Sequence, residues 1–295
     1  MSRYRTDWCI ARRVFLTLLV LTLADAGSTA PFLRPLRVMT FNIRYATERD
    51  GENAWEHRKE YVASMIRFHK ADAIGVQEAL IGQIEYLQEQ LPEYDWFGAG
   101  RDDGERAGEF CAVFYRADRL RVLRDSTFWL SETPENPGLG WDAACPRVVT
   151  WGRFFDLENE KIFYLFNTHF DHRGQQARIE SAKRLCARVN ETESEIPAIV
   201  CGDFNAEPNS AVYRILTQTG TGRVLIDARA AARYPHHGPE VTFTGFGRDL
   251  SPGKRIDYIF ISGPLQVRYH GNLSDTFDGR PPSDHMPVLV ECLFE

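Results

Sequence analysis

Three short motifs in the C-terminal third of the chain carry side chains suited to metal-assisted chemistry on phosphate groups. They are Gly202-Asp203-Phe204-Asn205, Arg255-Ile256-Asp257-Tyr258 and Ser283-Asp284-His285. Carboxylates and amides offer the oxygen atoms that hard divalent cations prefer, and a histidine exchanges protons near neutral pH. If these motifs meet in the folded chain, they predict a site that combines a metal ion with acid–base groups.

The candidate residues share one position, because each follows or ends an apolar run. The run at residues 36–42 ends at Asn42, and the run at 196–201 leads to Asp203. The full set is Asn42, Glu78, His169, Asp203, Asn205, Asp257, Asp284 and His285. Taken singly, each also fits a strand end, a helix cap or a turn. Together they predict one rim of a sandwich on which the strand ends meet.

The elements that must position these residues are mostly strands. Helical spacing of apolar residues predicts helices at 55–68, around Ile84 to Leu91, and at 175–189. Short β-rich runs predict strands at 36–42, 73–76, 94–97, 110–115, 121–130, 148–156, 161–168, 196–201, 224–228, 241–243, 256–261, 266–270 and 288–294. Residues 131–146, with three prolines and two glycines, predict a long loop. Strands without regular βαβ alternation favour two packed, mainly antiparallel sheets with helices outside.

The first 26 residues differ from the rest of the chain. Four arginines at positions 3, 5, 12 and 13 precede an apolar run at 14–23, and Ala24-Asp25-Ala26 follows. This order predicts a cleaved signal peptide at 1–26, a linker at 27–35, one folded domain at 36–295, and a secreted or periplasmic location. A membrane anchor is the alternative, but the run is shorter than the roughly 20 residues that span a bilayer. The adjacent arginines also resemble a twin-arginine signal.

The charge of the chain disfavours one class of partner. The net charge is −6 over 295 residues, and removal of residues 1–26 leaves about −8. Proteins that bind long nucleic acids usually gather lysine and arginine, so an acidic chain argues for smaller ligands unless basic patches form locally. Five of the six cysteines lie beyond residue 26, and their scattered spacing fits no zinc motif. Cys201, within an apolar run, is interpreted as a buried thiol.

Six motifs in a fixed order resemble the endonuclease/exonuclease/phosphatase superfamily, to which DNase I belongs. They are Thr40-Phe41-Asn42-Ile43-Arg44, Val76-Gln77-Glu78, Asn167-Thr168-His169-Phe170, Gly202-Asp203-Phe204-Asn205, Arg255-Ile256-Asp257-Tyr258-Ile259-Phe260 and Ser283-Asp284-His285-Met286-Pro287-Val288. The resemblance covers about residues 36–295 and implies a four-layer α/β sandwich. In that fold, two mainly antiparallel sheets pack face to face.

The resemblance also implies a role for each site residue. Glu78, with Asn42 and Asp284 beside it, would hold Mg²⁺ or Mn²⁺ through oxygen atoms. Asp203 would orient or deprotonate the attacking water, and Asn205 would donate to the phosphate or to that water. Asp257 would orient His285, which faces the phosphate together with His169. The division of protons among Asp203 and the two histidines stays open.

Substrate contacts are expected from four further residues. Arg147 resembles a phosphate-binding arginine of the family, since its planar fork suits phosphate. Asp171, His172 and Arg173 follow His169 in a loop and are predicted to contact the substrate, with a solvated turn as the alternative.

The chain is therefore predicted to be a metal-dependent phosphoester hydrolase that acts by in-line attack of water. A small phosphomonoester or phosphodiester, such as a sugar, inositol or lipid headgroup phosphate, suits the acidic chain. A secreted DNase I-like nuclease is the alternative, and a catalytically inactive phosphate-binding module is a third hypothesis. A monomer without a stable membrane span is expected.

Overall fold

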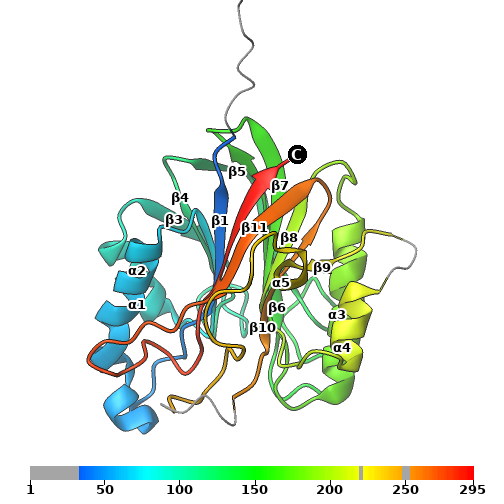
Figure 1. Ribbon diagram of the computed structural model, residues 1–295. Coiled ribbons are helices and arrows are strands. Elements are labelled where there is room, and N and C mark those ends of the chain that lie inside the picture. The colour runs from blue at the N-terminus through cyan, green and yellow to red at the C-terminus, as the bar shows by residue number, and fades with distance from the viewer. Residues whose placement is uncertain (1–32, 219–221, 248–252) are drawn as a thin grey trace, which may run out of the picture. The chain divides into compact units, whose positions relative to one another are not determined.

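Two six-stranded sheets form the centre of the folded part of the chain (Figure 1). The computed structural model describes residues 33–218, 222–247 and 253–295, so the predicted signal peptide lies outside the described residues. The strands are β1 Leu36–Asn42, β2 Ala73–Gln77, β3 Tyr94–Phe97, β4 Val113–Arg116, β5 Leu120–Trp129, β6 Val148–Asp156, β7 Lys161–His169, β8 Ala198–Asp203, β9 Ile226–Asp227, β10 Asp257–Ser262, β11 Leu265–Asn272 and β12 Val288–Phe294. The first sheet has the order β11-β12-β1-β2-β4-β3, and the second β5-β6-β7-β8-β10-β9.

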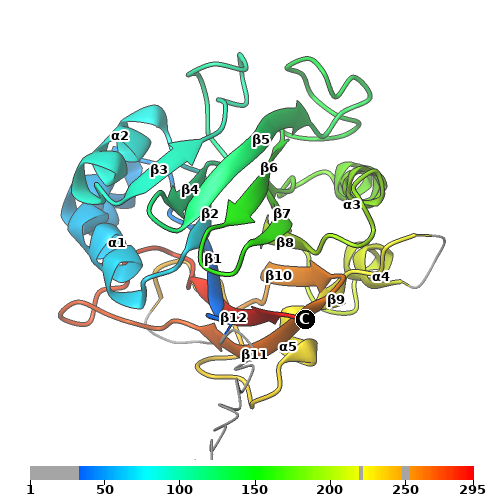
Figure 2. The same cartoon turned by 90° about the horizontal axis from the view of Figure 1, so that it is seen from above.

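Helices cover the outer faces of the two sheets. They are α1 Trp55–His69, α2 Ile81–Gln90, α3 Gln175–Asn190 and α4 Ala211–Thr217. The short α5 Ala228–Ala231 instead packs against β11 of the first sheet and β10 of the second, and a 3₁₀ helix spans Glu48–Asn53. In Figure 1, α1 and α2 lie to the left of the sheets, and α3 and α4 lie to the right. Viewed from above, the two sheets run side by side between these helical layers (Figure 2). The predicted four-layer sandwich is confirmed. Among the described helices, none is both long and apolar enough to cross a bilayer.

Three hydrophobic clusters separate the four layers, and strand alternation assigns each side chain to one of them. On β1, Val38 packs between the sheets, whereas Met39 and Phe41 face the helices. On β8, Cys201 lies between the sheets and Val200 faces α3 and α4. Successive side chains of a strand point to opposite faces. Because residues two apart on a strand lie on the same face, the polar residues at the strand ends face the same way as the apolar residues that pack between the sheets.

Each sheet contains one parallel pair of strands, and these pairs set the position of the rim. Parallel pairing joins β1 to β2, with Asn42 opposite Gln77, and β7 to β8, with His169 opposite Asp203. The carboxyl ends of both strands in a parallel pair lie at the same edge. The antiparallel neighbours β12 and β10 begin at that edge, so the first residue of β10, Asp257, pairs with Asp203. Asp257 therefore reaches the rim by starting a strand, whereas the sequence pattern had placed it after an apolar run.

Two predicted strands differ from the structure. The run at 241–243 forms no strand, and Phe243 makes only isolated bridges to Lys254 and His285. The hydroxyl of Thr242 instead accepts hydrogen bonds from the backbone amides of Ile256 and Asp257. The run at 224–228 shortens to β9, because the Asp227 side chain accepts from the amide of Arg229 and starts α5. Local capping outweighs β-propensity at this point.

A buried amide joins the two sheets beneath the rim. Asn167 of β7 donates to the carbonyls of Val76 and Ala112 at 3.0 and 2.8 Å, and its Oδ1 accepts from Gln77 at 2.6 Å. A Cβ atom on Gly75 would come within 2.6 Å of Asn167 Oδ1, so the absence of a side chain allows this close approach. These bonds cross from the second sheet to the first.

We predict that Asn167→Ala lowers the free energy of unfolding by about 3 kcal/mol, because buried carbonyls and an amide lose their partner. Chemical denaturation of the purified protein measures the change. Asn136→Ala, at an exposed loop position, is the matched control and should be neutral. Equal stabilities for the two variants would show that the amide bridge does not join the sheets.

Candidate active site

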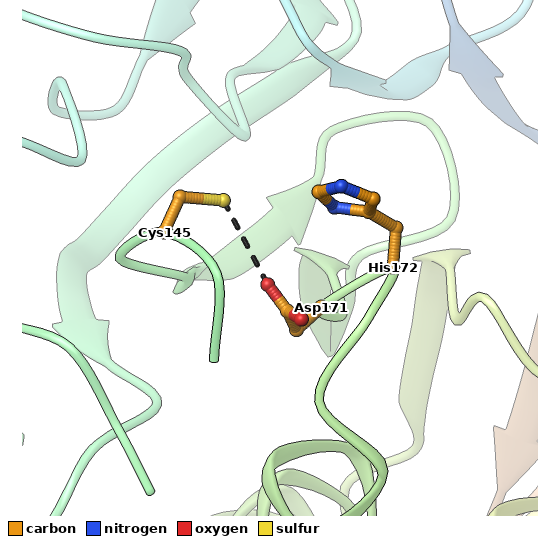
Figure 3. Close-up of side chains that lie close together, drawn as sticks. All are labelled: Cys145, Asp171 and His172. Carbon is orange, nitrogen blue, oxygen red and sulfur yellow. Dashed lines mark hydrogen bonds between the residues drawn. The ribbon is translucent and has the colours of Figure 1, made fainter. Parts of the chain in front are cut away.

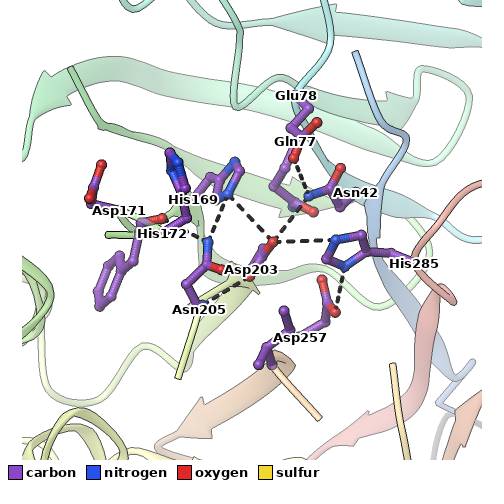
Figure 4. A network of polar contacts seen from close by, with 12 residues as sticks. Asn42, Gln77, Glu78, His169, Asp171, His172, Asp203, Asn205, Asp257 and His285 are labelled. Carbon is purple, nitrogen blue, oxygen red and sulfur yellow. Dashed lines mark hydrogen bonds and ion pairs between the residues drawn. The ribbon is translucent and has the colours of Figure 1, made fainter. Parts of the chain in front are cut away.

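The rim carries a connected polar network that centres on one oxygen atom of Asp203 (Figure 4). Asp203 Oδ2 lies 3.0 Å from Asn42 Nδ2, 3.4 Å from His169 Nε2 and 3.7 Å from His285 Nε2. The other oxygen, Oδ1, accepts from the backbone amide of Asn205 at 2.9 Å. Three strands and two connecting segments thus converge on a single carboxylate.

Burial and charge shift the pKa values of this network in different directions. Burial raises the pKa of Asp203 to about 7, the Asp257 charge adds to the rise, and His285 opposes it. Burial, followed by the charge of Arg147, lowers the pKa of His169 well below its usual value. Burial also acts to lower the pKa of His285, but the charge and hydrogen bond of Asp257 outweigh it and raise that pKa well above its usual value. One histidine is therefore neutral and the other is a cation.

Asp257 orients His285 from below. Its Oδ2 lies 2.9 Å from His285 Nδ1, so that the other ring nitrogen faces Asp203. Both side chains are buried, and Asp257 is at the start of β10. A carboxylate on one imidazole nitrogen fixes the tautomer and the ring orientation. This arrangement is the one that the resemblance implied.

Asn205 connects the end of β8 to the segment that carries His169. Its Nδ2 donates to the carbonyl of Phe170 at 3.0 Å and lies 3.1 Å from His169 Nε2. The residue has a positive φ of 46°, and Glu78 has one of 62°. Non-glycine residues rarely adopt this conformation, and such strain is found at functional turns. Glu78 directly follows the end of β2 and Asn205 lies two residues after the end of β8, where the chain turns sharply to present these side chains.

The predicted metal ligands lie on the side of the rim formed by the first sheet. Glu78 Oε1 accepts from Asn42 Nδ2 at 3.0 Å, and Oε2 accepts from the amide of Tyr45 at 3.2 Å. Asp284 Oδ1 accepts from the Ser283 hydroxyl, which also donates to the carbonyl of Asn42. Burial raises the pKa of Asp284, and the charge of Glu78 adds to this rise although His285 opposes it. Both carboxylates line the same cleft, and carboxylate oxygen atoms are the ligands that a hard divalent cation prefers.

The hydrogen bonds of Asn42 differ from those expected of a metal ligand. Its amide nitrogen donates to both Glu78 and Asp203, and its Oδ1 accepts from the amide of Arg44. In this orientation the side chain holds the two carboxylates at a fixed separation. Its predicted role as a metal ligand stays a prediction.

A second group of ligand-type side chains, Cys145, Asp171 and His172, lies beside the network (Figure 3). Arg147 occupies this cluster, since its Nε lies 3.5 Å from Asp171 Oδ2 and its Nη2 lies 3.0 Å from His172 Nδ1. A guanidinium in this position disfavours a metal cation by charge repulsion. The cluster instead holds Arg147, which is 5% exposed, toward the cleft.

The cleft above the network has a volume of about 550 Å³. Arg147 and His172 line it, as predicted for substrate contacts, but Asp171 and Arg173 are not among its lining residues. Asp171 is fully buried and accepts hydrogen bonds from the amides of Ala144, Arg173 and Gly174. Its carboxylate organises the loop, because its oxygen atoms are occupied by backbone donors. Arg173 is exposed to solvent.

Arg58 joins two site-bearing segments in a way that the sequence pattern did not reveal. It lies buried on α1 and donates to the carbonyls of Ile43, Arg44, Asn53 and Pro282. These carbonyls belong to the segment after Asn42 and to the segment before Asp284. Burial lowers its pKa to about 10, partly offset by the charge of Asp284. An arginine within a helix gives no local signal of such a role, because its partners lie far apart in sequence.

The fold and the arrangement of the site are those of a superfamily of phosphoester hydrolases. The chain belongs to the Endonuclease/Exonuclease/phosphatase family, whose model matches residues 39–285.

Two solved structures from Bacteroides are similar over nearly the whole folded part. An endonuclease/exonuclease/phosphatase from Bacteroides vulgatus is 39% identical with a TM-score of 0.84, and the match covers 89% of this chain and 100% of that one. A mannosyl-6-phosphatase from Bacteroides thetaiotaomicron is 37% identical with a TM-score of 0.83, covering 88% and 100%.

A more distant relative is the CCR4-Not complex 3'-5'-exoribonuclease subunit Ccr4 of Mycosarcoma maydis. It is 22% identical over 349 residues, which cover 91% of this chain and 52% of that protein. The chain thus spans about half the length of this relative.

We predict that Arg58→Met raises the divalent-metal concentration needed for half-maximal phosphoester hydrolysis and lowers kcat by about 10- to 100-fold. The reason is that the segments carrying Asn42 and Asp284 lose their common anchor, and small misplacements are costly in active sites. Arg67→Met, an exposed arginine of the same helix that donates to the carbonyl of Gln90, is the control. Loss of stability without a change in metal dependence would limit Arg58 to a structural role.

Proposed function

We propose that the chain is an exported phosphatase that uses Mg²⁺ or Mn²⁺ to hydrolyse a small phosphomonoester. The observation that carries the proposal is the convergence of Asn42, His169 and His285 on Asp203, beside the carboxylates of Glu78 and Asp284. The similarity to a mannosyl-6-phosphatase over the whole folded part supports a small sugar phosphate. Export rests on the predicted signal at residues 1–26, and the N-terminal sequence of the mature protein tests it.

The residues divide the reaction between them. When bound at Glu78 and Asp284, a divalent ion supplies neutralisation of charge on the phosphate. Asp203 accepts a proton from the attacking water. The cationic His285, held by Asp257, and the amide of Asn205 stabilise negative charge that develops on the phosphate oxygens. Arg147 provides a second positive charge. The neutral ring of His169 contacts the phosphate or the leaving group.

A nuclease remains the second candidate function, because the exoribonuclease subunit Ccr4 is a relative. The net charge of the chain opposes it. Nicking of plasmid DNA or shortening of RNA by the purified domain would favour the nuclease. Turnover confined to small phosphoesters would favour the phosphatase.

We predict that EDTA abolishes phosphate release and that added Mn²⁺ or Mg²⁺ restores it. Asp203→Ala and His285→Ala should each lower kcat by about 10²- to 10⁴-fold, the range for a lost acid–base group. Asp125→Asn, at an exposed position of β5, is the control and should keep full activity. Full activity in chelator would exclude the metal-dependent reaction, and no turnover of any phosphoester would revive the phosphate-binding module.

The elevated pKa of Asp203, about 7, predicts the pH dependence of the reaction. Only the ionised carboxylate accepts a proton, so kcat/KM should fall about tenfold for each pH unit below that value and level off above it. A pH–rate profile at saturating metal measures this limb. A flat profile down to about pH 5 would show that Asp203 is not the base.

A further inference from the structure

The cleft extends beyond the groups that a phosphate occupies. Its volume of about 550 Å³ exceeds what one phosphate fills, and its lining continues from Asp203 and the histidines to Arg101, Glu109, Arg147 and His172. This part of the wall must contact the alcohol portion of any phosphoester bound at the rim. Its chemistry therefore indicates which alcohol fits.

Arg101 and Glu109 form a close pair in this wall. Arg101 Nη1 donates to Glu109 Oε2 at 2.5 Å, and the same oxygen lies 3.9 Å from Arg147 Nη1. Glu109 Oε1 accepts no hydrogen bond from the described residues, so this oxygen is free to bind a ligand. A carboxylate oxygen beside a guanidinium presents an acceptor and donors together. Neighbouring hydroxyl groups of a polyol, which donate and accept, complement such a pair.

The backbone holds the pair in place beside the metal side of the rim. The amide of Arg101 donates to the carbonyl of Glu109 at 3.1 Å, and Trp129 Nε1 donates to the carbonyl of Arg101 at 2.7 Å. The amide of Phe110 donates to the carbonyl of Ala79 at 2.8 Å, one residue after Glu78. Fixed partners on both sides lower the entropy that binding would otherwise lose.

The charges of the lining disfavour a second phosphate. Five basic side chains line the cleft, Arg44, Arg101, Arg147, Arg178 and Lys254. Five carboxylates oppose them, Glu78, Glu109, Asp203, Glu207 and Asp284. The formal charges of these arginine, lysine and carboxylate side chains therefore cancel, so the lining offers no excess of positive side chains for a second phosphate.

The lining also lacks a platform for a nucleobase. Among the described lining residues, Phe243 is the one phenyl ring, and it packs against His285 with ring centroids 4.8 Å apart. Binding of nucleic acid bases relies on stacking against exposed aromatic rings. A neutral polyol is therefore a better match for the alcohol portion than a nucleoside.

We infer that Glu109 and Arg101 bind hydroxyl groups of the leaving alcohol, so that the substrate class is the monophosphate of a neutral polyhydroxyl compound such as a hexose. The inference rests on the proposed phosphatase function and adds the determinant of its specificity. Glu109 acts on the binding of the alcohol and takes no part in proton transfer.

The test compares two substrates that share the phosphate but differ in the alcohol. With Glu109→Gln, KM for a hexose 6-phosphate should rise about 10- to 100-fold, the effect of losing hydrogen bonds to a charged group. Kinetics on 4-nitrophenyl phosphate, which carries no hydroxyl groups, should stay within about twofold of wild type. Glu105→Gln, an exposed residue of the same loop, is the matched control and should change neither substrate.

Three outcomes would overturn the inference. Equal losses on both substrates, or a higher metal requirement in Glu109→Gln, would assign Glu109 to the phosphate or metal. Wild-type kinetics on both substrates would remove it from the site. Faster turnover of inositol polyphosphates or nucleotides than of hexose 6-phosphate would exclude the substrate class.

A failure of the proposed function is distinguishable from these. If wild type hydrolyses neither substrate, calorimetric titration of hexose 6-phosphate into the metal-loaded protein and into Glu109→Gln decides the inference directly. Weaker binding by the variant supports the polyol subsite, and equal binding rejects it.

Discussion

The close approach of the two sheets at Asn167 is the contact on which the site depends. Its side chain bonds to two carbonyls and an amide of the other sheet, and Gly75 leaves the space for it. Buried polar groups are costly when unpaired, so this arrangement favours one relative position of the sheets. That position brings the end of the β1–β2 pair to the end of the β7–β8 pair. Without it, Glu78, Asp284 and His285 on the side of the first sheet would not share a cleft with His169 and Asp203 of the second.

The chemistry at the rim depends on buried titratable groups whose pKa values are shifted in different directions. Asp257 bonds to His285 and favours its charged form, whereas burial and then the charge of Arg147 favour the neutral form of His169. Asp203, between them, has a raised pKa because it is buried and close to Asp257. Titratable groups whose pKa values are driven apart can take distinct acid, base and electrostatic roles. The network is thus compatible with proton transfer near neutral pH.

The wall of the cleft is tied to the rim by a backbone hydrogen bond. The Arg101–Glu109 pair is fixed to the turn after Glu78 through the Phe110–Ala79 backbone bond. The proposed alcohol-binding pair and the proposed metal ligand Glu78 are therefore on adjoining segments, and substitutions in one segment can be separated from those in the other by choice of substrate.

The sequence by itself determined the strand-ending motifs, the sandwich architecture and the residues of the rim, because apolar runs and polar termini are local patterns. It did not determine which face of a central strand lies between the sheets, since both faces of β1 and β8 are buried and apolar. Asp171, predicted to contact substrate, proved to be saturated by backbone amides. No local sequence pattern marks Arg58 or Glu109. The carbonyls that Arg58 binds are as far apart in sequence as Ile43 and Pro282, and Glu109 lies beside Arg147, which is distant in sequence. Tertiary structure alone decided these roles, since hydrogen bonds and charge pairs act between atoms that only folding brings together.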